Sequence, residues 1–300
     1  MTTIRTRLFS SEMGRVERVE CHAAPPIVRE DYSPEFQIAF PYRGAFAWHV
    51  GGDIVVSDPN QVLFVRGGES FRIRELRAEG FAELIITPDL QTLRDAAETG
   101  GFELEHHPLF TARTCRVPAP LQRLSVHFLH RSQDEHFDEL QASEILVRLL
   151  TDALRLSPPA RVQSPHTMRL IRRAKDFLEA NFREPLHLAD VASAVGGSPA
   201  YLTDVFRRFE GVPLHAYLTQ LRLGRALVEL SHTEDLTGLA LDLGFSSHSH
   251  FSLAFRRFFG CTPSEFRRAT RPSTPIVALR RHRAGAPSRT SVVSHAAERA

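Results

Sequence analysis

The C-terminal third of the sequence carries two groups of mostly short polar and arginine side chains, spaced alike and forty-nine residues apart. Hydroxyl groups can hydrogen-bond base edges in the major groove of DNA, and guanidinium groups bind phosphates or guanine. The first group is Ser198, Ala200, Tyr201, Thr203, Asp204, Arg207 and Arg208, and the second is Ser247, His248, Ser249, Ser252, Leu253, Arg256 and Arg257. This repeat predicts two equivalent surfaces that contact DNA.

Each group falls on one face of an expected amphipathic helix, over residues 198–210 and 247–259. The opposite face is apolar, with positions recurring at i, i+3, i+4 and i+7. Those positions are Leu202, Val205, Phe206 and Phe209 in the first copy and Phe251, Ala254, Phe255 and Phe258 in the second. A serine at each start can cap the helix, and Gly211 or Gly260 can end it in the left-handed conformation.

A shorter apolar helix is expected before each of these, over residues 188–195 and 236–243. Gly196 and Gly244 follow them and allow a tight turn, so residues 188–210 and 236–259 are predicted to form two helix-turn-helix units. Pro213 opens an expected connecting helix of roughly eighteen residues, about 27 Å long. Such a spacer could place the second helices of the two units about one DNA turn, near 34 Å, apart.

The alternative is a helical bundle in which the phenylalanines are core and the arginines are simply solvated. The block Phe-Arg-Arg-Phe-x-Gly occurs twice, each time behind a glycine turn, and this repetition disfavours the alternative.

Residues 166–268 resemble the AraC/XylS family of bacterial transcription regulators. The similarity is densest in the runs 239–245, 247–251 and 255–263. It implies that the second helix of each unit enters the major groove of promoter DNA, and that RNA polymerase and a small-molecule effector are further partners. At Asp204 and Leu253 better-known relatives often carry arginine or another long polar residue, and neither side chain here can bond guanine as arginine does.

The N-terminal half shows a different pattern, in which short runs typical of β-strands alternate with turn residues. The runs are 36–40, 45–50, 54–56, 62–66, 70–74 and 81–87. Their regular spacing predicts an antiparallel barrel or sandwich, and the family resemblance implies a cupin-like jelly roll that senses a ligand. The expected fold is therefore α+β and multidomain: an N-terminal cupin-like β-barrel with trailing helices, then an all-α double helix-turn-helix.

Helical patterns follow the strands at 89–98, 120–131 and 138–156. The last has Leu140, Ile145, Leu149 and Ala153 among its apolar positions. The resemblance implies a role in a homodimer, while packing onto the protein's own barrel is equally compatible. The expected organisation is a sensor and dimerisation domain (1–156), a linker rich in proline (157–165), a DNA-binding domain (166–268) and a disordered basic tail (269–300).

Cupin-like barrels raise the possibility of metal catalysis, for which His22, His49, His106 and His107 are the candidates. No His-x-His plus Glu grouping occurs on the expected strands, and adjacent histidines point to opposite sides of a strand. We therefore expect no enzyme activity, metal or cofactor. Aromatic residues could instead line an effector cavity, for which the candidates are Phe40, Tyr42, Trp48 and His49.

Two alternatives remain at this point, a cupin enzyme fused to a DNA-binding module and a regulator whose barrel only dimerises. A chain of 300 residues is long enough for about two domains. Its arginines gather toward the C-terminal end: residues 269–300 hold six basic against one acidic residue. Lys175 is the only lysine, a bias that we attribute to genome composition.

The three cysteines are far apart and show no C-x-x-C spacing, so a disulfide framework or zinc site is not expected. The sequence has no apolar run of about eighteen residues, the length that a membrane helix needs. A cytoplasmic protein without membrane association is the expectation.

Overall fold

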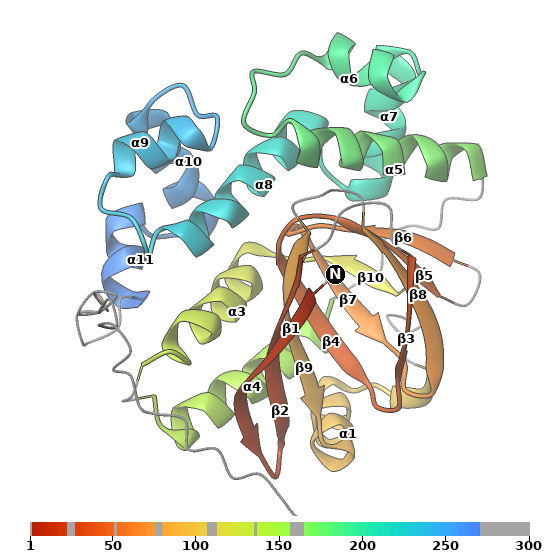
Figure 1. The fold of residues 1–300 in the computed structure, drawn as a ribbon, viewed down its shortest axis with the longest axis vertical. Coiled ribbons are helices and arrows are strands. Elements are labelled where there is room, and N and C mark those ends of the chain that lie inside the picture. Colours follow the sequence, from red (N-terminus) through yellow and green to blue (C-terminus); the bar gives the residue numbers. More distant parts are fainter. Residues whose placement is uncertain are drawn as a thin grey trace, which may run out of the picture.

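The computed structural model describes residues 2–22, 28–50, 53–75, 80–106, 113–134, 137–156 and 165–270. Residues 2–156 form two β-sheets and the helices packed on them, which we call the sandwich region (Figure 1). Residues 165–270 consist of helices and the turns between them, and they lie across one end of the sandwich; we call them the helical region. Most of the expected linker and the expected tail beyond residue 270 lie outside the described residues.

The strands pair in two antiparallel sheets. One has the order β1-β2-β9-β4-β7-β10 and the other the order β3-β8-β5-β6. Their bounds are β1 (Thr2–Ser11), β2 (Gly14–His22), β3 (Val28–Ser33), β4 (Gln37–Arg43), β5 (Phe46–Val50), β6 (Asp53–Ser57), β7 (Gln61–Val65), β8 (Glu69–Glu75), β9 (Phe81–Pro88) and β10 (Thr114–Arg116). All six expected runs are strands, β4 to β9. Strands β1, β2, β3 and β10 were not expected. Strands β1, β3 and β10 are edge strands, and each of the four contains charged residues that obscure an apolar alternation.

The two sheets pack face to face as an open sandwich. Their shared core holds Phe46 and Trp48 from β5 and Phe81 and Ile85 from β9. Within the described strands, no hydrogen-bonded pair joins one sheet to the other. Of the barrel and the sandwich that the strand spacing allowed, the structure has the sandwich, and the cupin-like β-barrel implied by the family resemblance is not confirmed. Whether the edge strands of the two sheets pair with each other depends on tertiary contacts. The lengths and spacing of the strands therefore do not distinguish a barrel from a sandwich.

Three helices cover the outer face of the six-stranded sheet. They are α1 (Leu90–Gly100), α3 (Ala119–Arg131) and α4 (Glu139–Leu154), and a short 3-10 helix, η1 (Leu104–His106), follows α1. Helix α4 buries Leu146, Leu149 and Ala153 in the core under this sheet. Leu140 is 78% exposed and Ile145 is half-buried, so the buried stripe differs from the expected one. The helix thus packs on its own sheet through the stripe that holds Leu149.

The helical region consists of α5 (Pro165–Ala180), α6 (Leu188–Val195), α7 (Pro199–Glu210), α8 (Leu214–Glu229), α9 (Leu236–Asp242), α10 (His248–Phe259) and α11 (Pro263–Thr270). One core joins α5, α6, α7 and the start of α8. A second joins the rest of α8 with α9, α10 and α11, and it includes Ala119 and Val126 of α3. The core of the second unit therefore continues into the sandwich region.

Among the described helices, none combines the length and the apolar character that crossing a membrane requires.

Candidate nucleic-acid interface

The second helix of each unit, α7 or α10, begins and ends as the sequence predicts; we call these the reading helices. The Ser198 hydroxyl accepts a hydrogen bond from the Tyr201 amide at 3.3 Å, and the Ser247 hydroxyl accepts one from the His250 amide at 3.1 Å. Gly211 and Gly260 end the helices with φ angles of 72° and 77°. Each helix is therefore defined by its own sequence at both ends.

The polar faces of the reading helices are accessible. All fourteen residues expected to contact DNA are exposed or half-buried, whereas Leu202, Phe206, Phe251 and Phe255 on the opposite faces are fully buried. The buried positions differ from expectation at Ala254, which is half-buried, and in the last turn of each helix. Phe209 and Phe258 are half-buried, while Glu210 and Phe259, which occupy equivalent positions of the repeat, are buried.

Asp204 on α7 holds Arg208, one turn further along the helix. The Arg208 Nε and Nη2 atoms lie 3.1 and 2.7 Å from the two carboxylate oxygens. Both side chains are more than half exposed, so the pair adds little stability and mainly orients the guanidinium. Thr203 donates its hydroxyl proton to the Pro199 carbonyl at 2.8 Å and keeps its lone pairs for a donor on a base edge.

The polar face of α10 combines hydroxyl, imidazole and guanidinium groups. Ser252 Oγ lies 3.3 Å from His248 Nε2, and His250 Nδ1 lies 3.1 Å from the hydroxyl of Ser246. Arg256 and Arg257 are exposed in the last turn, where α7 has Arg207 and Arg208. The two faces therefore offer the same chemistry toward phosphate and different polar groups toward bases.

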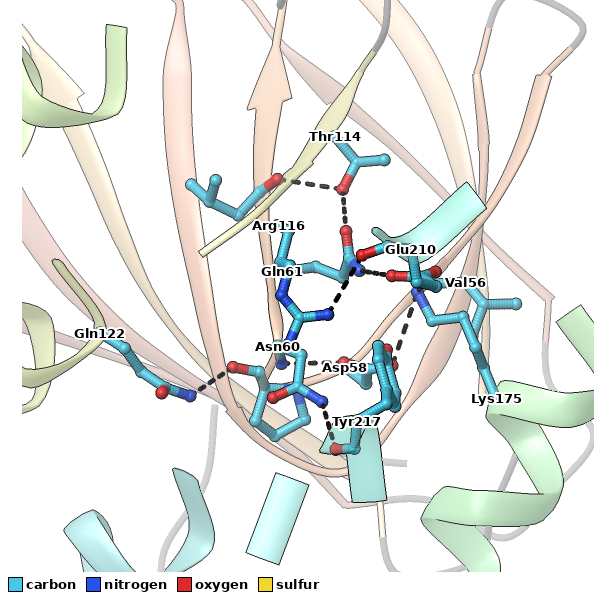
Figure 2. Close-up of polar contacts among 12 residues, drawn as sticks. Val56, Asp58, Asn60, Gln61, Thr114, Arg116, Gln122, Lys175, Glu210 and Tyr217 are labelled. Carbon is cyan, nitrogen blue, oxygen red and sulfur yellow. Dashed lines mark hydrogen bonds and ion pairs between the residues drawn. The ribbon is translucent and has the colours of Figure 1, made fainter. Parts of the chain in front are cut away.

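A buried polar cluster, which sequence reasoning missed, joins α5, α7 and α8 to the turn between β6 and β7 (Figure 2). Lys175 Nζ donates to the Val56 carbonyl at 3.1 Å and lies 3.3 Å from Glu210 Oε1 and 3.6 Å from Asp58 Oδ2. The Tyr217 hydroxyl donates to Asp58, and burial raises the pKa of Tyr217 well above its usual value. The available signal was that Lys175 is the only lysine in a chain of arginines.

A cavity of about 120 Å³ lies between the two sheets of the sandwich. Trp48, which is 2% exposed, lines it together with Phe46 and Phe71, and its polar lining includes Arg5, Arg15, Gln37 and Glu83.

The structure does not bring together the four residues expected to bind an effector. Phe40 and Tyr42 lie in the core between the six-stranded sheet and the helices, on the face away from the cavity. His49 neighbours Trp48 and so points to the other side of β5. Burial and the nearby Arg74 and Arg172 lower the pKa of His49. Of the four, Trp48 is the one that lines the cavity.

The other histidines considered for metal binding are dispersed. His106 lies 3.4 Å from Glu103 at the surface, His107 is outside the described residues, and His22 ends β2. Across the described ranges, no three His, Cys, Asp or Glu side chains are grouped as a metal site would need.

Comparisons with known proteins match the helical region. Residues 191–269 match the family model of a helix-turn-helix domain. The putative HTH-type transcriptional regulator YkgA of Escherichia coli is 33% identical over 100 residues, which are 33% of this chain and 42% of that protein. The regulatory protein PocR of Salmonella typhimurium is 31% identical over 105 residues, 35% of this chain and 34% of that one. The chain thus spans less than half the length of these two relatives.

A solved structure also matches, that of a transcriptional regulator from Chromobacterium violaceum described as having an AraC-type DNA-binding domain. It is 34% identical and covers 37% of this chain and 99% of its own, with a TM-score of 0.34. The resemblance that the sequence carries is confirmed: the C-terminal segment of this chain is a helix-turn-helix domain of the AraC/XylS family.

Proposed function

We propose that the protein is a transcription regulator that binds operator DNA through α7 and α10 of one chain. The observation that carries this proposal is the pair of capped helices with equivalent exposed faces, forty-nine residues apart and joined by α8. Each face holds short polar groups flanked by arginine, the combination used for base edges and phosphates. The named relatives are regulators, which favours binding over catalysis.

The cavity in the sandwich supports control by a small-molecule effector. Most of the residues that line it are apolar or aromatic, and the polar side chains come from Arg5, Arg15, Asp31, Ser33, Gln37 and Glu83. Binding sites for small molecules have this composition. We propose the cavity that Trp48 lines as the effector site, in place of the set expected from the sequence. RNA polymerase and a second copy of the chain are further proposed partners, in the cytoplasm.

Selection of sites by the full-length protein from a pool of randomised DNA duplexes tests DNA binding. We expect an enriched sequence with two short half-sites about 10 base pairs apart, centre to centre. Arg207→Ala and Arg256→Ala should each weaken binding to the selected duplex, whereas Arg94→Ala on α1, an exposed arginine far from the reading helices, should not. Enrichment of no sequence by the folded protein would refute the proposal.

A further inference from the structure

The sandwich region contacts both reading helices at the same position of the repeat. Arg116 Nη1 donates to the backbone carbonyl of Glu210, the last residue of α7, at 3.3 Å. Arg123 Nη1 donates to the backbone carbonyl of Phe259, the last residue of α10, at 2.6 Å. Glu210 and Phe259 are forty-nine residues apart, the period of the repeat, and the two arginines are seven residues apart.

A helix C-terminus suits this contact. Its last carbonyls lack partners within the helix, and the helix dipole makes this end negative. A guanidinium satisfies the carbonyl and the dipole together, and a hydrogen bond from a charged donor is stronger than a neutral one. The two units are therefore attached to the sandwich region by the same chemical device.

The segment that holds these arginines, residues 116–123, is itself fixed in the sandwich region. The Val117 amide donates to the Asn60 carbonyl at 2.9 Å, and Gln122 Nε2 donates to the Pro59 carbonyl at 2.6 Å (Figure 2). Ala119, between the two arginines, is buried in the core of the second helix-turn-helix unit. A shift of this segment would therefore move the ends of both reading helices.

Helix α8 connects the two units within the helical region, and segment 116–123 adds a second connection from the sandwich region (Figure 1). We infer that segment 116–123 sets the separation and orientation of the two reading helices, with Arg116 holding α7 and Arg123 holding α10. This inference rests on the proposed function. Both arginines are positioning residues that act on DNA only through the helices, so they should determine which spacing between half-sites the protein accepts.

The test uses the full-length protein and the duplex selected from the randomised pool. Two further duplexes have the distance between half-sites increased or decreased by one base pair, which rotates one half-site by about 34° relative to the other. We expect the unaltered protein to bind these about tenfold more weakly, a loss similar to that from one mismatched base pair. We call the factor by which binding weakens on the altered duplexes the spacing ratio. In Arg116→Ala and Arg123→Ala the spacing ratio should fall to about threefold or less, while base preference within each half-site stays unchanged.

Arg131→Ala is the matched control, because Arg131 is a half-buried arginine of the same helix as Arg123 whose hydrogen bonds go to Asp134 and Gln141 of the sandwich region. It should keep the tenfold ratio. Arg123→Lys retains a cation near the helix end and should restore much of the ratio. Thermal unfolding of each variant separates loss of spacing preference from loss of fold. If an alanine variant does not fold, the glutamine variant at the same position, Arg116→Gln or Arg123→Gln, replaces it.

Two results would overturn the inference: spacing ratios in the arginine variants equal to that of the unaltered protein, or an unaltered protein indifferent to spacing. Both differ from the failure of the proposed function, in which no sequence is enriched at all and the inference falls with it.

Discussion

Asp204 lies on the exposed face of α7, where a carboxylate is repelled by phosphates unless it accepts hydrogen bonds. It accepts one from Arg208 Nε and forms an ion pair with Arg208 Nη2. We therefore expect Asp204→Ala to weaken binding to all operator variants alike, as Arg208→Ala should, because the carboxylate orients the guanidinium. Affinities across a library of single-base operator variants decide this. A loss concentrated at one base pair, of about 1–3 kcal/mol, would show instead that Asp204 reads a base, as an acceptor for cytosine N4.

Lys175 is the residue on which the buried polar cluster depends. Its side chain is 5% exposed, and its carboxylate partners Asp58 and Glu210 are 1% and 3% exposed. Lys175→Met would leave these carboxylates buried without a cation, and we expect a loss of about 3–5 kcal/mol in the free energy of unfolding. Denaturant titration measures it. Arg173→Met, at an exposed position of the same helix, should change stability by no more than about 0.5 kcal/mol.

At the scale of elements, the packing of α3 against α8 should depend on pH. His130 of α3 is buried, its Nε2 atom lies 3.1 Å from the Ser231 hydroxyl, and its ring is 6.0 Å from that of His232. Burial, with smaller effects from His232 and His127, lowers the pKa of His130 to about 4. An unfolded histidine has a pKa of about 6.5, so protonation favours the unfolded chain. This contribution to stability is fully present above pH 6.5 and is lost as the pH falls toward 4.

The difference between these two pKa values corresponds to about 3 kcal/mol. Free energies of unfolding measured between pH 7.5 and 4.5 should therefore decrease less steeply in His130→Gln than in the unaltered protein. The same substitution at His215, an exposed histidine of α8, serves as the control and should leave the slope as it was. Identical slopes for the protein and its His130 variant would contradict the argument.

At the scale of the whole molecule, charge is distributed unevenly along the chain. The acidic residues predominate before residue 165, and the segment 165–268 has 13 basic against 11 acidic residues. We expect DNA affinity to fall steeply with salt, since each phosphate contact adds about 0.9 to the slope of log affinity against log salt. Arg257→Ala should reduce that slope by about 1, if this arginine meets a phosphate. Equilibrium titrations at several salt concentrations measure the slope, and a slope near zero would exclude the proposed interface.

The sequence by itself determined the features that depend only on residues close together along the chain. Both reading helices, their serine caps and their glycine ends follow from a repeat of 3.6 residues and from local backbone chemistry. The strands β4 to β9 and the helices α1, α3 and α4 were found in the same way. These signals are local because a helix closes its hydrogen bonds within its own sequence. A strand's alternation of side chains between two faces is likewise visible in its own residues.

Tertiary structure alone decided what each buried face meets. The sequence could not place Phe40 and Trp48 in two different cores, on opposite sides of the six-stranded sheet, because alternation shows that two faces exist and not which element covers each. Nor could it pair Lys175 with Asp58, 117 residues away, or Arg123 with the end of α10, 136 residues away. Such contacts arise from the path of the chain in space, since their free energy depends on geometry that no local pattern encodes.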